Sequence, residues 1–123
     1  MIPATGSGNN QPPVEFSWIG TWEQQWSAAF RGVRIVIVDE NTPLSLYTWM
    51  FEWNFIRHYD WEIKNNNVLV LSYGEVTIHL TFVFQQYYHY YFSLLINNAT
   101  ITPYNEQTLS IHYFQTPAYL IRQ

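Results

Sequence analysis

Apolar and polar side chains alternate with a period of two along most of this chain, and helical periodicity is nearly absent. In a β-strand alternate side chains share one face, so the pattern predicts strands joined by short turns. The expected strands cover residues 14–26, 33–38, 44–55, 57–64, 68–73, 76–84, 87–97, 99–104 and 107–114. Residues 24–31 are the one candidate for a short helix, unless they continue the first strand.

The predicted connections between these strands are short. Asn65-Asn66-Asn67 reads as a turn, Gln85-Gln86 as a two-residue hairpin connection, and Asn98 as a further turn. An all-β fold of about eight to ten strands follows, an antiparallel meander closed into a small barrel so that no strand edge stays exposed. A two-sheet β-sandwich is the alternative, but a Greek-key sandwich needs at least one long connection.

One domain accounts for the whole length. Residues 1–13 are rich in Gly, Pro and Asn and read as a flexible leader. Residues 14–116 form the expected barrel domain, and residues 117–123 the expected C-terminal tail. A single domain of this size can bury its own core without disulfides or metals.

An aromatic ladder stands out in the expected strand over residues 44–55. Its odd positions place five large rings on one face, namely Tyr47, Trp49, Phe51, Trp53 and Phe55. We expect Trp49, Phe51 and Trp53 to point into the barrel, since burying each ring stabilises the fold by about 2–3 kcal/mol. The opposite orientation would bury Glu52 unpaired, at a cost of several kcal/mol. The ladder therefore predicts either a core or the lining of a binding site.

A second aromatic block, residues 87–92, carries rings on both faces of its expected strand, including Tyr88 and Tyr90. Two interpretations stay open. The tyrosines can simply favour a strand at the surface, or they can form a surface for a sugar or a protein partner, because Tyr combines apolar area with a hydroxyl group.

Composition narrows the classes of function. Charged residues are 11% of the chain, aromatic residues 20%, and the formal net charge is −4. Five scattered basic residues form no stripe for phosphates, so nucleic acid is not an expected partner. The apolar runs are of strand length, which predicts no membrane-spanning helix. A weakly charged, amide-rich and aromatic-rich chain favours a secreted, periplasmic or cell-surface location.

Catalytic and metal-binding patterns are weak. No nucleophile elbow, phosphate loop or zinc motif is present, so we expect no enzyme, no cofactor and no metal. The histidines are His58, His79, His89 and His112. A hairpin at residues 85–86 would pair His79 with Phe92 and leave His79 and His89 about 10 Å apart, too far to share an ion.

Gly20-Thr21-Trp22 in the opening strand is similar to the Gly-x-Trp motif that seals the closed end of lipocalin-like (calycin) barrels. The strand–turn–strand rhythm of residues 61–71, and the paired strands that end at Leu109-Ser110-Ile111, also resemble that family. The resemblance covers residues 16–114. It implies structural roles for Gly20 and Trp22, and a barrel that holds a small ligand.

Two features depart from the family. The arginine that packs over the tryptophan from near the last strand is missing there, and only Arg122 in the expected tail could serve. Arg57-His58-Tyr59 has the spelling of the Arg-x-Tyr carboxylate site of fatty-acid-binding relatives, but it lies in mid-chain, so that role is not transferred.

The function expected from the sequence is non-catalytic binding of a small apolar or amphipathic ligand inside the barrel. The expected ligand-binding residues are Tyr47, Trp49, Phe51, Trp53, Tyr88 and Tyr90. The alternative is an interaction module that uses exposed rings to bind glycans or further copies of itself.

Overall fold

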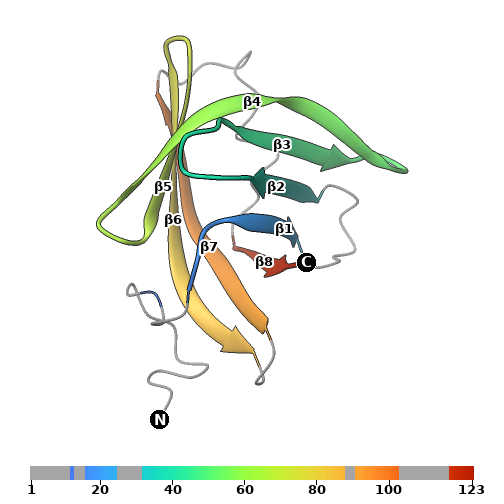
Figure 1. Cartoon of the computed structure of the whole chain (residues 1–123), viewed down its shortest axis with the longest axis vertical. Coiled ribbons are helices and arrows are strands. Elements are labelled where there is room, and N and C mark those ends of the chain that lie inside the picture. Colours follow the sequence, from blue (N-terminus) through green and yellow to red (C-terminus); the bar gives the residue numbers. More distant parts are fainter. Residues whose placement is uncertain (1–11, 13–15, 25–31, 88–90, 103–116) are drawn as a thin grey trace.

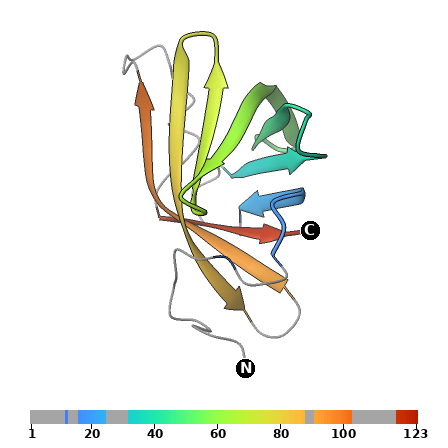
Figure 2. The same ribbon diagram turned by 60° about the vertical axis from the view of Figure 1, so that its left-hand side comes forward.

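The computed structural model describes residues 12, 16–24, 32–87, 91–102 and 117–123. They form eight antiparallel strands that follow one another around a closed barrel, in which the last strand pairs with the first (Figures 1 and 2). The strands are β1 (Gly20–Gln24), β2 (Val33–Ile37), β3 (Leu44–Trp49), β4 (Trp53–Lys64), β5 (Val68–Tyr73), β6 (Val76–Tyr87), β7 (Tyr91–Thr102) and β8 (Ala118–Arg122). The predicted all-β meander closed into a barrel is confirmed, and the β-sandwich is not formed.

Alternating side chains from the described strands fill the inside of the barrel as one hydrophobic core. Along β2 the buried positions are Val33, Ile35 and Ile37, and along β3 Leu44 and Leu46. The largest fully buried side chains elsewhere are Trp22, Tyr59, Phe82, Leu69, Leu71, Ile78, Leu80 and Leu94. An eight-stranded barrel has an interior just wide enough for such side chains.

The C-terminal segment is part of the barrel, so the predicted tail at residues 117–123 is wrong. Strand β8 pairs with β1, where Trp22 lies opposite Arg122, and with β7, where Leu94 lies opposite Leu120. Ala118 and Leu120 are buried in the core. The barrel domain therefore extends beyond residue 116, because β8 supplies the hydrogen bonds that both neighbouring strands need.

The aromatic ladder is a hairpin and not one strand. Trp49 at the end of β3 pairs with Trp53 at the start of β4, and the chain reverses direction through residues 50–52. Strand β4 then runs without a break to Lys64, so the strand predicted to begin at Arg57 is its second half. A register shift beside Tyr47 leaves one extra residue in β4 and bends this hairpin.

The longest hairpin, β6–β7, also differs from the prediction. Gln85 and Gln86 lie within β6, which pairs onward as far as Tyr87 with Tyr91. Asn98 is not a turn, because β7 is continuous and Asn98 pairs with Thr81 beside a register shift. As a result His79 lies opposite Thr100 and not Phe92. Gln-Gln lacks the backbone preferences of a tight turn, which is why the strand continues through it.

Several predictions fall on residues outside the described part of the chain. They concern most of the leader over residues 1–13, the candidate helix after Gln24, the side chains of Tyr88 and Tyr90, and the strand over 107–114. The turn at Asn65-Asn66-Asn67 is described and is confirmed. Asn65 and Asn66 have positive φ angles of 54° and 66°, which asparagine tolerates better than most residues.

The β2–β3 connection is held by a carboxylate. Asp39 Oδ1 accepts hydrogen bonds from the Thr42 hydroxyl and the Asn41 backbone N–H, both at 2.8 Å. The Thr42 bond, followed by the Asn41 bond, lowers the pKa of Asp39 below its usual value of 3.8. A folded-state pKa below the unfolded one adds stability above pH about 4, and that stability is lost as pH falls through the folded-state pKa.

We therefore expect Asp39→Ala to lower the free energy of unfolding slightly at pH 7 and to have less effect at pH 3. Urea denaturation at both pH values measures the difference. Glu40→Ala removes the same charge from the same exposed loop and is the control for net charge. A loss for Asp39→Ala that is larger at pH 3 than at pH 7 would contradict this role of the carboxylate.

Candidate functional site

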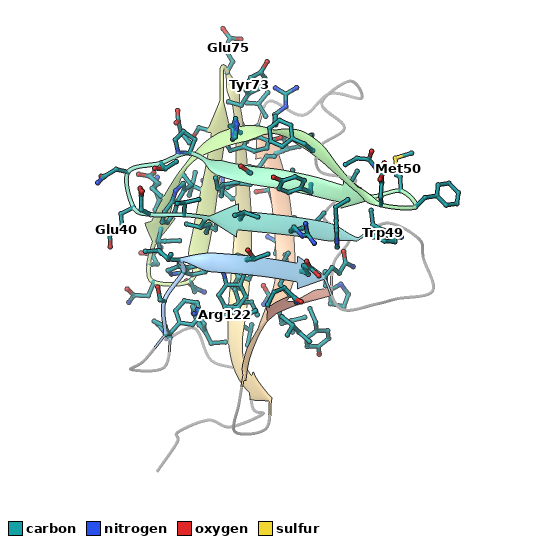
Figure 3. The ribbon with its side chains drawn as sticks, turned by 45° about the vertical axis from the view of Figure 1, so that its right-hand side comes forward. Glu40, Trp49, Met50, Tyr73, Glu75 and Arg122 are labelled. Carbon is teal, nitrogen blue, oxygen red and sulfur yellow. The ribbon has the colours of Figure 1, made fainter. Side chains whose placement is uncertain are left out.

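Four rings of the β3–β4 hairpin lie together on the outside of the barrel, where Trp49 is labelled in Figure 3. We call Tyr47, Trp49, Trp53 and Phe55 the outer aromatic face. The ring centroids of Tyr47 and Phe55 are 5.5 Å apart, with the planes at 68°. Those of Trp49 and Trp53 are 5.3 Å apart, with the planes at 73°. Such edge-to-face pairs stabilise one another, so the rings form a fixed surface.

The predicted inward orientation of Trp49, Phe51 and Trp53 is therefore wrong. Trp49 is 40% exposed and Phe55 is 51% exposed. The inner positions of β3 belong instead to Leu44, Leu46 and Thr48. Thr48 is buried and its hydroxyl donates a hydrogen bond to the carbonyl oxygen of Gly32, at 3.3 Å. Compact aliphatic side chains fit the narrow interior of the barrel better than a row of indoles.

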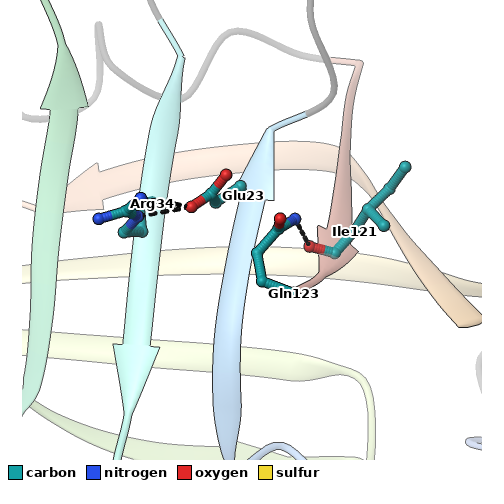
Figure 4. A network of polar contacts seen from close by, with 4 residues as sticks. All are labelled: Glu23, Arg34, Ile121 and Gln123. Carbon is teal, nitrogen blue, oxygen red and sulfur yellow. Dashed lines mark hydrogen bonds and ion pairs between the residues drawn. The ribbon is translucent and has the colours of Figure 1, made fainter. Parts of the chain in front are cut away.

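An ion pair supports the outer aromatic face from the neighbouring strands. Arg34 on β2 binds Glu23 on β1, with Nη2 at 2.6 Å and Nε at 2.7 Å from the same carboxylate oxygen (Figure 4). The Arg34 guanidinium also lies 4.6 Å from the ring centroid of Trp53 and 5.8 Å from that of Tyr47. Both charged side chains are largely covered. Cation–π contacts of this kind fix Arg34 and the two rings relative to one another.

Polar groups border the rings along β3 and β4. Ser45 Oγ and His58 Nδ1 are 3.1 Å apart, and the His58 ring lies 4.9 Å from that of Phe55. Ser45 and His58 are opposite one another in the register. The two side chains therefore form a cross-strand polar pair beside the rings.

Phe51 does not belong to this surface. It lies at the tip of the β3–β4 hairpin and is 99% exposed. The structure thus brings together Tyr47, Trp49 and Trp53 of the predicted ligand-binding residues and separates Phe51 from them. Sequence reasoning missed the support from Arg34 and Glu23. Arg34 and Glu23 carry opposite charges and lie opposite one another on neighbouring strands. Recognising this pair from the sequence would require the strand register, which the sequence does not specify.

A second cluster closes one end of the barrel around Trp22. Its ring is buried and its indole N–H donates to the carbonyl oxygen of Trp18, at 2.9 Å. The Arg122 guanidinium lies 4.6 Å from the Trp22 ring centroid and donates to the carbonyl oxygen of Ser17. Phe16 stacks on Trp22 with the centroids 5.7 Å apart. Burial lowers the pKa of Arg122 below its ordinary value, because desolvation disfavours the charged guanidinium.

The arginine that seemed to be missing over the tryptophan is therefore supplied by β8. A Cβ built at Gly20, where φ is +143°, would lie 3.9 Å from Arg122 Nε. Gly20 thus lies directly beside this cluster. Arg122 continues the Ala118–Leu120–Arg122 alternation, and that period-two pattern was the signal that sequence reasoning overlooked.

The described residues contain neither a cluster of metal ligands nor a membrane-spanning helix. No three His, Asp or Glu side chains among them lie close enough together to hold a metal ion. His89 and His112 lie outside the described part. The described part of the chain contains no helix with the length and apolar character needed to cross a membrane.

Comparison of the chain with protein-family models, with curated proteins and with solved structures finds no significant match.

Proposed function

We propose that this chain is a non-catalytic carbohydrate-binding module, and that the outer aromatic face is its binding surface. The observation that carries the proposal is the outward position of four preorganised rings bordered by hydrogen-bonding side chains. It corresponds to the glycan-binding alternative that the sequence left open.

The chemistry of a sugar fits this surface. One side of a pyranose ring is a patch of C–H groups, which packs on an indole or phenol ring, while its hydroxyl groups point outward at the rim. The outer aromatic face offers Trp53 and Phe55 for packing, and Ser45, His58 and Arg34 beside them for hydrogen bonds. Because the rings already hold their positions, binding costs little conformational entropy.

A ligand inside the barrel has less support. Tyr47, Trp49, Phe51 and Trp53, which were expected to line that interior, all lie outside it or at the hairpin tip. The described inner residues pack as one hydrophobic core.

The lipocalin-like resemblance concerns the fold, and the closed antiparallel barrel and the Arg122–Trp22 contact support it. The low charge and the aromatic surplus favour a location outside the cytoplasm.

The experiment is a glycan-array screen followed by calorimetric titration with the best oligosaccharide. Trp49→Ala and Phe55→Ala remove exposed rings without opening the core. We expect each to weaken binding by about twofold to tenfold, since a ring contact is worth about 0.5–1.5 kcal/mol. Tyr119→Ala removes an exposed ring from β8, away from this surface, and should leave affinity unchanged.

Three outcomes would overturn the proposal. One is that no glycan binds. Another is that the ring variants bind as well as the unaltered protein. The third is concentration-dependent self-association, measured by light scattering, that disappears in the same ring variants while no glycan is bound. That result would assign the outer aromatic face to assembly.

A further inference from the structure

The tip of the β3–β4 hairpin is an apolar projection. Its residues 50–52 extend beyond the neighbouring strands, with Met50 at the outer end (Figures 1 and 3). Phe51 is 99% exposed and Met50 is 61% exposed. Large apolar side chains at that level of exposure side by side are unfavourable in water, so this tip calls for an explanation beyond folding.

The backbone conformation of Phe51 is a second, independent sign that this residue has a role beyond folding. Its φ angle is +67°, a conformation that bulky side chains rarely adopt. At other turns of the described barrel the residues with positive φ are Asn65, Asn66 and Gly74, which suit it. A glycine or asparagine would serve the β3–β4 turn better than phenylalanine does. Strain kept at an exposed aromatic residue points to a role in binding.

The tip is also held in shape. The Met50 backbone N–H donates to the carbonyl oxygen of Glu52 at 2.9 Å. Asn54 Nδ2 donates to the carbonyl oxygens of both Glu52 and Met50, at 3.0 and 3.3 Å. These bonds close the turn and direct Met50 and Phe51 away from the barrel. The projection is therefore preorganised for insertion into a partner.

We propose that this tip inserts Met50 and Phe51 into the interfacial region of an electrically neutral lipid bilayer. A convex tip of two side chains buries too little area for a stable contact with a flat protein surface, whereas fluid lipid closes around it. Trp49, partly exposed at the base of the tip, is a residue type that prefers the membrane interface. Glu52 in the turn and the net charge of −4 oppose anionic lipid.

The proposed binding is weak and reversible, since only two or three side chains enter the bilayer. It goes beyond carbohydrate binding and uses different residues. A protein held at a membrane by this tip would present the adjoining outer aromatic face close to the lipid surface, because both belong to the same hairpin.

The test is flotation with phosphatidylcholine vesicles at millimolar lipid, repeated with vesicles that contain phosphatidylserine. Phe51→Gly suits the positive φ angle, so it should keep the fold and reduce the partition coefficient about tenfold. The double variant Met50→Ser, Phe51→Gly should have a still lower partition coefficient. Val38→Ser, which alters another exposed apolar residue in the β2–β3 connection, is the matched control and should bind as the unaltered protein does.

The proposal fails if the unaltered protein does not float with phosphatidylcholine, or if Phe51→Gly floats equally well. It also fails if phosphatidylserine strengthens binding in a salt-dependent way, or if Phe51→Gly abolishes a dimer and no vesicle binding is seen. Glycan titration of Phe51→Gly separates the two proposals, because its sugar affinity should not change whichever way the vesicle result falls.

Discussion

Removal of residues 117–123 is expected to abolish the folded barrel. The deletion takes away β8, which pairs with both β1 and β7. Both strands would become open edges with unpaired backbone groups, which favours aggregation. It also removes Ala118 and Leu120 from the core and Arg122 from its contact with Trp22. Together these losses exceed the net stability of about 5–15 kcal/mol that a typical domain has.

Far-UV circular dichroism and a thermal melt would show this directly, with loss of the cooperative transition as the expected result. Tyr119→Ala changes an outward position of the same strand and should melt cooperatively near the temperature of the unaltered protein. If the deleted protein instead melts cooperatively at an unchanged temperature, then β8 is not needed to close the barrel, and residues 117–123 act as a tail after all.

The barrel itself could be predicted because its evidence is local. Runs such as Val33–Ile37 and Val68–Tyr73 have strong β-propensity and are bounded by turn residues. Short connections then favour a meander, and closure removes its edges. Strand β8 escaped prediction because it directly follows Pro117 and carries fewer β-branched residues than Val33–Ile37, so its alternation resembles an ordinary terminus.

The orientation of the aromatic ladder could not be predicted, because both sets of alternate positions are apolar at its start. Leu44 and Leu46 compete with Tyr47 and Trp49 for the interior, and ring size alone favoured the wrong set. The deciding constraints are not local. The interior of an eight-stranded barrel is narrow, and Trp22, Tyr59 and Phe82 already supply its large rings.

The chain reversal at residues 50–52 could not be predicted from local sequence rules either. Its turn contains no glycine, and Phe51 occupies the position with positive φ. Sequence rules for turns look for Gly, Asn or Asp at such a place. The candidate site and the hairpin tip thus both lie where the local rules fail, as is common at positions retained for function rather than for folding.

Two tryptophans provide the sharpest contrast in expected stability. Trp22→Ala should lower the free energy of unfolding by about 3–5 kcal/mol, because it leaves a large cavity in the core and removes the ring that the Arg122 guanidinium contacts. The inward orientation expected from the sequence would instead assign such a loss to Trp53→Ala. In the structure Trp53 lies on the outer aromatic face, where its contacts are Trp49 and Arg34, so Trp53→Ala should cost only about 1 kcal/mol.

Urea denaturation of the two variants, measured in parallel by circular dichroism, decides between these assignments. Glu52→Gln changes an exposed position of the hairpin tip and is the control. Its free energy of unfolding should equal that of the unaltered protein. A Trp53 variant that loses as much stability as the Trp22 variant would place its ring in the core and remove the basis of the outer aromatic face. A urea midpoint close to that of the unaltered protein for Trp53→Ala, together with a much lower midpoint for Trp22→Ala, is the result that the packing of this barrel requires.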